Sequence, residues 1–151
     1  MITLLRHAES TYNLYNLDEI NCDLSDNGVK QAFKLKGHYD MVIVSPLKRA
    51  MNTLKLSKIT YDKLENWNDV REKRDNLCDF IEGEHIDFES EDDLLVRINN
   101  VKNKLNKLTG NILIVTHADF IWYFTSHISN DERFGKWVDN ACSISINLKS
   151  N

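Results

Sequence analysis

Basic side chains follow three short apolar segments of the chain, in each case at or soon after the point where the segment ends. The side chains are Arg6, His7, Arg49 and His117, and the apolar segments are 2–5, 41–44 and 112–115. Such segments are typical of buried strands, and an open α/β sheet binds its ligands just beyond the carboxyl ends of its strands. We therefore expect two arginines and two histidines to meet in one crevice. This set of donors suits a phosphate.

The chemistry open to these groups is attack on phosphorus. A neutral imidazole can form a covalent phosphohistidine, which divides hydrolysis into two displacements, and His7 is the candidate nucleophile. Arg6 and Arg49 can present planar guanidinium groups to the nonbridging oxygens, and they also disfavour protonation of His7. A protonated His117 would donate to the same oxygens, and Asn13 could add a neutral donor.

The elements that must position these residues alternate between strand and helix. Apolar periodicity predicts strands at 2–5, 41–45, 59–64, 112–116 and 142–148, and helices at 26–36, 46–56, 90–110 and around 120–124. This alternation predicts an α/β three-layer sandwich, with a mostly parallel central sheet, helices on both faces and the last strand at an edge.

Local signals mark the ends of the expected helices. Ser25 is the expected N-cap of the helix from Asp26, and Gly37 is its expected stop. Ser45 and Pro46 read as an N-cap and first helical residue, and a capping box begins at Ser90.

The region from Glu65 to Glu89 is irregular, charged and too long for an ordinary connection. Loops of this length inside a domain are usually functional, so we expect a loop or lid that carries a missing catalytic group.

Four segments in the same order resemble the motifs of the histidine phosphatase superfamily, also called phosphoglycerate mutase-like. They are 5–10 followed by Asn13, 24–32, 45–50 followed by Thr53, and 115–118. Alanines stand at Ala8 and Ala118, where glycines are common in the family. The resemblance implies a metal-independent phosphomonoester hydrolase that acts through a phosphohistidine and needs no cofactor.

The same resemblance points to a carboxylic acid. Val70-Arg71-Glu72 is similar to the segment in which the family places its acid, although the Gly-Trp-Glu-Gly-like sequence that commonly follows is absent. A carboxyl group with a raised pKa would protonate the leaving alkoxide and then deprotonate the attacking water. Glu72 is the expected acid, with Glu82 and Glu84 as the alternatives.

Composition limits the partners and the location of the protein. The chain has 151 residues, is 42% hydrophobic and 28% charged, and is expected to form one catalytic domain over 1–151. With a net charge of −4 and scattered basic residues it carries no footprint for nucleic acid or a membrane. It shows no targeting segment. Three widely spaced cysteines indicate no disulfide framework and no metal site, and they favour a reducing cytoplasm.

Other readings of the sequence stay open. A phosphoglycerate mutase would use the same phosphohistidine, a metal-dependent phosphohydrolase would need a ligand cluster that no motif here provides, and a noncatalytic module would only bind a phosphorylated ligand. The expected substrate is a phosphorylated small molecule or a phosphorylated protein.

The remaining histidines, His38, His85 and His127, are expected to be structural or on the surface. The aromatic segment Trp122–Phe124 is expected to pack in the core.

Overall fold

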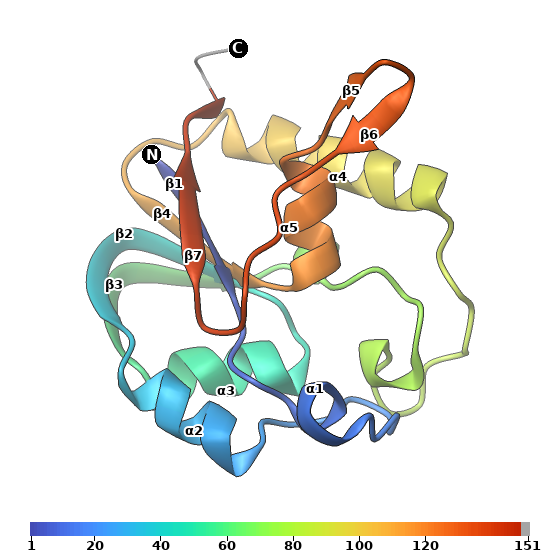
Figure 1. The fold of residues 1–151 in the computed structure, drawn as a ribbon. Helices are drawn as coiled ribbons and strands as arrows, with labels where there is room; N and C mark the ends of the chain where they lie inside the picture. The colour runs from blue at the N-terminus through green and yellow to red at the C-terminus, as the bar shows by residue number, and fades with distance from the viewer. Residues whose placement is uncertain (149–151) are drawn as a thin grey trace.

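The structure, a computed structural model, describes residues 1–148 and is built on a five-stranded sheet in the order β3-β2-β4-β1-β7 (Figure 1). The strands are β1 (Ile2–Arg6), β2 (Lys36–Val44), β3 (Lys58–Asn66), β4 (Ile112–Thr116) and β7 (Ser143–Ile146). β1 to β4 pair in parallel, whereas β7 lies antiparallel to β1 at the edge. The expected mostly parallel sheet with an edge strand at the carboxyl end is confirmed.

Helices cover both faces of the sheet. They are α1 (Thr11–Tyr15), α2 (Asp26–Phe33), α3 (Lys48–Leu56), α4 (Glu91–Leu105) and α5 (Ala118–Phe124). α3 packs against one face and α2 packs against α3, while α4 and α5 lie on the opposite face (Figure 1). The expected three-layer arrangement is therefore confirmed.

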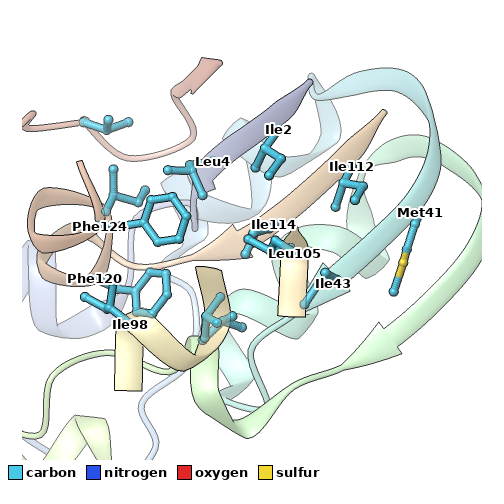
Figure 2. Close-up of a cluster of buried hydrophobic side chains, with 14 of the residues drawn as sticks. Ile2, Leu4, Met41, Ile43, Ile98, Leu105, Ile112, Ile114, Phe120 and Phe124 are labelled. Atoms are coloured by element: carbon cyan, nitrogen blue, oxygen red, sulfur yellow. The ribbon is translucent and has the colours of Figure 1, made fainter. Parts of the chain in front are cut away.

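Alternation along the strands produces two separate cores. On the α4 and α5 face the sheet contributes Ile2, Leu4, Met41, Ile43, Ile112 and Ile114 (Figure 2). On the α3 face it contributes Leu5, Val42, Val44, Leu113 and Val115. Each fully buried aliphatic side chain contributes about 1.5–3 kcal/mol, so the central strands, from which the basic residues extend, are held from both sides.

The boundaries of α2 and α3 differ from those predicted. α2 ends at Phe33 rather than at residue 36, and Gly37 lies within β2 instead of stopping the helix. The cause is strand pairing, because Lys36 already faces Lys58 in the β2–β3 ladder. α3 begins at Lys48 rather than at Pro46, with Leu47 at the N-cap position and no side-chain cap.

The other two capping signals are confirmed. The hydroxyl oxygen of Ser25 accepts a hydrogen bond from the N–H of Gly28 at 3.0 Å, and that of Ser90 accepts from the N–H of Asp93 at 3.1 Å. The helix that follows Ser90 ends at Leu105, earlier than predicted, and β7 stops at Ile146 rather than at residue 148.

Three short elements are not predicted from the sequence because none is long enough for an apolar pattern to repeat more than once. One is α1, which has five residues and a capping box made by Ser10 and Asn13. The others are β5 (His127–Ser129) and β6 (Glu132–Phe134), which form a hairpin beside α4 (Figure 1). Its turn residues Asn130 and Asp131 have φ angles of 51° and 65°, a geometry that Asn and Asp tolerate.

The region 65–89 is largely irregular, as expected. β3 extends to Asn66, and two short 3-10 helices follow, η1 (Asn68–Val70) and η2 (Leu77–Asp79). Across residues 1–148, no helix has the length and apolar character needed to cross a membrane. Cys22, Cys78 and Cys142 are free thiols.

Candidate active site

The predicted site residues meet where three neighbouring parallel strands end. β4 lies between β1 and β2, so the segments that leave their carboxyl ends begin side by side. The N–H of His7 donates to the carbonyl of Thr116 at 3.0 Å, and the N–H of Ser45 donates to that of Val115 at 3.1 Å. These bonds extend the sheet by one residue on each side and fix the start of both loops.

His7 is held in one tautomer by its neighbours. Nδ1 lies 2.7 Å from the carbonyl oxygen of Ala8, which can only accept, so Nδ1 carries the proton. Nε2 accepts a hydrogen bond from Nε of Arg49 at 3.3 Å, so it carries the lone pair. Burial of the ring, followed by the positive charges of Arg49 and Arg6, holds the pKa of His7 well below its usual value. The ring is therefore neutral, and its electron pair lies on Nε2, where it accepts the hydrogen bond from Arg49.

The backbone around His7 is anchored to two helices. The N–H of Ala8 donates to Oγ1 of Thr53 at 2.9 Å, and that hydroxyl donates to the carbonyl of Arg49 at 2.7 Å. On the other side the chain passes close to α2, where a Cβ on Gly28 would lie 2.0 Å from the carbonyl oxygen of Glu9. Glycine is thus required at residue 28 if this loop is to keep its path.

Arg49 spans the site from α3 and is buried, with 4% of its side chain exposed. Besides its contact with His7, it donates from NH1 to the carbonyl of Cys78 at 2.6 Å and from NH2 to Oδ1 of Asp79 at 2.8 Å. Asp79 is equally buried, with 3% exposed. The long irregular region thus brings a carboxylate to the site that the motifs do not indicate.

Arg6 lies on the other side of the site. Its NH1 donates to the carbonyl of Val138 at 3.1 Å, and its guanidinium carbon lies 5.1 Å from the centre of the Trp137 ring. Among the residues that the structure describes, its buried Nε has no hydrogen-bond partner.

His117 lies against His7, with ring centroids 5.1 Å apart. Its Nε2 is 2.8 Å from Oγ of Ser45, and within residues 1–148 its Nδ1 has no partner. Burial, and then the positive charge of Arg49, holds the pKa of His117 well below its usual value. The ring is neutral here, rather than the imidazolium considered from sequence, and it can still donate one hydrogen bond.

Glu72 enters the site at the start of α5. Its Oε1 accepts from the N–H groups of Phe120 at 2.9 Å and Lys73 at 3.0 Å, and its Oε2 accepts from the N–H of Asp119 at 3.1 Å. Burial, and then the negative charges of Asp119 and Asp79, raises the pKa of Glu72 to about 8. These effects outweigh the hydrogen bonds, which favour the carboxylate, so the group is largely a protonated acid near neutral pH.

The two alternative acids lie in different surroundings. Glu82 pairs with Lys48 at 2.9 Å, and Glu84 pairs with Arg71 at 2.8 Å. Hydrogen bonds from these cations lower the pKa of each carboxyl group to about 2. Both are ionised at neutral pH and have no proton to give.

Asn13 reaches the site only indirectly. Its Oδ1 accepts from the N–H of Ser10 at 3.0 Å and from Nδ2 of Asn140 at 3.2 Å. Nδ2 of Asn140 also donates to the carbonyl of His7 at 3.1 Å. The structure therefore places Asn13 in the scaffold beside His7.

Four further residues shape the site without being assigned to it from sequence: Ser45, Asp79, Trp137 and Asn140. A signal for Ser45 is present, because it follows β2 as His7 follows β1, but a serine before a proline also indicates a cap. Asp79 lies within the region expected to carry a missing group. Trp137 and Asn140 belong to a segment between β6 and β7 that has no periodicity.

The strand order and the cluster of histidines and arginines beyond the strand ends define an α/β protein with its candidate ligand site at the carboxyl edge of the sheet. A family model of the histidine phosphatase superfamily (branch 1) matches residues 2–76. The chain belongs to this superfamily.

Solved structures agree on the fold. An alpha-ribazole phosphatase from Shigella flexneri is 15% identical with a TM-score of 0.64, and the match covers 97% of this chain and 98% of that chain. A phosphoglycerate mutase from Thermus thermophilus is 19% identical with a TM-score of 0.59, over 82% of this chain and 81% of that one.

A phosphoserine phosphatase from Entamoeba histolytica is 22% identical with a TM-score of 0.55, over 81% of this chain and 76% of that one. At these identities the likeness shows a common fold. No curated protein sequence matches the chain.

Proposed function

We propose that this protein hydrolyses phosphomonoesters through a covalent phosphohistidine on His7. The observation that carries the proposal is the state of the imidazole: its Nδ1 proton is held by the carbonyl of Ala8, and its Nε2 lone pair faces the guanidinium of Arg49. A neutral nitrogen nucleophile beside a fixed cation is what attack on a phosphate dianion requires.

In the first step the Nε–H of Arg49 turns from Nε2 of His7 to a nonbridging oxygen, and Nε2 forms a bond to phosphorus while the bond from phosphorus to the ester oxygen breaks. Glu72 gives its proton to that oxygen, and the alcohol leaves. In the second step the Glu72 carboxylate removes a proton from water, whose oxygen attacks phosphorus, and the bond to Nε2 breaks to release phosphate. Glu72 is then protonated again, so the cycle closes without a further reactant.

The remaining groups stabilise charge. Nε of Arg6 and Nδ1 of His117 are buried nitrogens without a partner among the described residues. Nε of Arg6 can donate to a nonbridging oxygen, and so can Nδ1 of His117 when Nε2 accepts from the hydroxyl of Ser45. Arg49 adds a guanidinium beside the nucleophile, and Asn13 adds an amide at the rim. Negative charge that develops in the transition state is met by donors that are already in place.

We further propose that the substrate is a small phosphorylated molecule. His7, His117, Arg6, Arg49 and Glu72 are each no more than 8% exposed, so the reacting phosphate must enter a narrow site. Solved neighbours named as phosphatases of alpha-ribazole and phosphoserine are consistent with a small substrate. The alternative function, a mutase, would need a phosphoryl acceptor other than water.

We also propose that the protein acts in the cytoplasm, because its few, widely spaced cysteines favour a reducing compartment.

The purified protein should release phosphate from nitrophenyl phosphate in excess EDTA, and vanadate should inhibit this reaction. The reason is that arginines and histidines, rather than a bound cation, neutralise the phosphoryl group. Phosphate release is measured directly, which separates hydrolysis from transfer to a second alcohol. Activity that appears only when Mg²⁺ or Zn²⁺ is added would contradict the proposal, as would transfer without release.

A further inference from the structure

Arg49 can serve the proposed reaction only if its guanidinium keeps a fixed position beside His7. Arginine has a long flexible side chain, and its Nε reaches Nε2 of His7 at 3.3 Å, a long hydrogen bond that cannot hold it alone. The other two nitrogens of the guanidinium form hydrogen bonds to the segment that contains Cys78 and Asp79. NH1 donates to the carbonyl of Cys78 at 2.6 Å, and NH2 donates to Oδ1 of Asp79 at 2.8 Å.

Asp79 is itself fixed on several sides. Its Oδ2 accepts hydrogen bonds from the N–H groups of Asn76 at 2.9 Å and Asp75 at 3.1 Å. Its carbonyl accepts from NH2 of Arg71, a fully buried arginine, at 2.8 Å. The carboxylate therefore has one available orientation, and Arg49 adapts to it rather than the reverse.

We propose that Asp79 is the positioning residue of the phosphate site: its buried carboxylate holds the guanidinium of Arg49 beside Nε2 of His7, where its Nε–H can pass to an oxygen of the entering phosphate. This inference rests on the proposed function and extends it to a residue outside the motifs of the sequence. Asp79 acts through Arg49 and is not expected to touch the substrate. When either partner of a buried carboxylate–guanidinium pair is removed, the remaining charge is uncompensated. The remaining side chain then no longer keeps its position.

Asp79→Asn is the informative variant. One amide oxygen can still accept from the N–H of Asn76 and keep the turn, but the NH₂ group then faces the donors of Arg49. We expect the guanidinium to move away from His7. Misplacement by about 1 Å can cost on the order of 10²-fold in rate, so kcat/KM for nitrophenyl phosphate should fall roughly 10- to 100-fold, and inorganic phosphate should bind more weakly.

Asp18→Ala is the matched control. Oδ1 of Asp18 accepts from the N–H of Cys78 at 3.1 Å, so this change loosens the same turn but leaves the Asp79 carboxylate that faces Arg49 unaltered. A merely structural role of the turn predicts similar losses in both variants. The positioning role predicts that Asp18→Ala loses much less phosphate binding and kcat/KM than Asp79→Asn, even where its melting temperature falls as far.

The decisive readout is the ¹⁵N NMR signal of His7 Nε2 in the ligand-free protein. Asp79→Asn should shift this signal, because the hydrogen bond from Arg49 is lost, and Asp18→Ala should leave it in place. This measurement needs no turnover, so it decides the role of Asp79 even if the protein proves not to be a phosphatase.

Three results would overturn the inference. The first is a ¹⁵N signal of His7 Nε2 that does not shift in folded Asp79→Asn. The second is tighter binding of inorganic phosphate by Asp79→Asn with undiminished turnover, which would mean that Asp79 competes with the substrate. If Asp79→Asn does not fold, the wild-type protein is tested instead. The Nε–H of Arg49 should then exchange slowly with solvent and correlate with Nε2 of His7, and rapid exchange would be the third contrary result.

Discussion

His7→Ala should abolish turnover, with a loss of roughly 10⁴-fold or more in kcat, because the variant has no atom that can form the phosphoenzyme. Phosphate release from nitrophenyl phosphate is the measurement. Arg6→Ala and Arg49→Ala should also lose phosphate affinity, since each guanidinium acts on the bound substrate as well as on the transition state. His7 follows β1 and belongs to neither apolar core, so we expect His7→Ala to fold.

His38→Ala is the control for this experiment. His38 lies in β2 with 56% of its side chain exposed, where it contacts Thr60 and Asp62, far along the chain from the strand ends that form the site. It should keep wild-type activity. Near wild-type rates in His7→Ala, or an equal loss in His38→Ala, would refute the assignment of the nucleophile.

Glu72→Gln should separate substrates by their leaving groups. An alkyl alkoxide needs a proton to depart, whereas nitrophenolate does not, so turnover of glycerophosphate should fall on the order of 10²-fold or more while phosphoenzyme formation from nitrophenyl phosphate is spared.

In the wild-type protein, turnover of glycerophosphate should also fall when Glu72 loses its proton. Because the pKa of Glu72 is raised to about 8, the acid form is lost above that pH, and glycerophosphate turnover should decline there.

Glu82→Gln and Glu84→Gln test the alternatives under the same conditions. Both carboxyl groups are ionised through their ion pairs with Lys48 and Arg71, so neither variant should show the leaving-group effect. A selective loss on glycerophosphate in either of these variants, with none in Glu72→Gln, would place the acid further along the chain.

Much of the fold could be predicted because its signals are local or periodic. The buried strands that precede His7, Ser45 and His117 are uniformly apolar, and Ser25 and Ser90 lie at the helix starts that their side chains cap. The same logic fails for α2, whose carboxyl end is set by pairing between β2 and β3, a contact that a local pattern does not contain.

The residues of the site also fall into those that a sequence pattern indicates and those that it does not. His7, Arg6 and His117 could be brought together from sequence because each follows a strand end, and parallel strand ends meet at one edge. Asp79 could not, because its partner Arg49 lies 30 residues away and its segment has no repeating pattern. The prediction of Ser45 as the N-cap of α3 is wrong, because Leu47 holds that position. The hydroxyl of Ser45 accepts from the N–H of Leu47 at 3.3 Å and contacts His117.

The protonation of the site also depends on burial, which sequence does not give. The sequence leaves His117 open to be an imidazolium, yet burial and the nearby Arg49 keep it neutral. Glu72 needs a raised pKa for its expected role, and burial together with Asp119 provides it. Spacing along the chain locates such groups, but their surroundings in the folded protein decide their charge.

Trapping the phosphoenzyme tests the central proposal most directly. Rapid quenching during turnover should yield a covalently phosphorylated protein that is stable in base and labile in acid, as a phosphoramidate is, and peptide mapping should place the phosphoryl group on His7. Phosphate found on a carboxylate or on His117, or solvent oxygen entering by direct attack on the ester with no trapped species, would contradict the account.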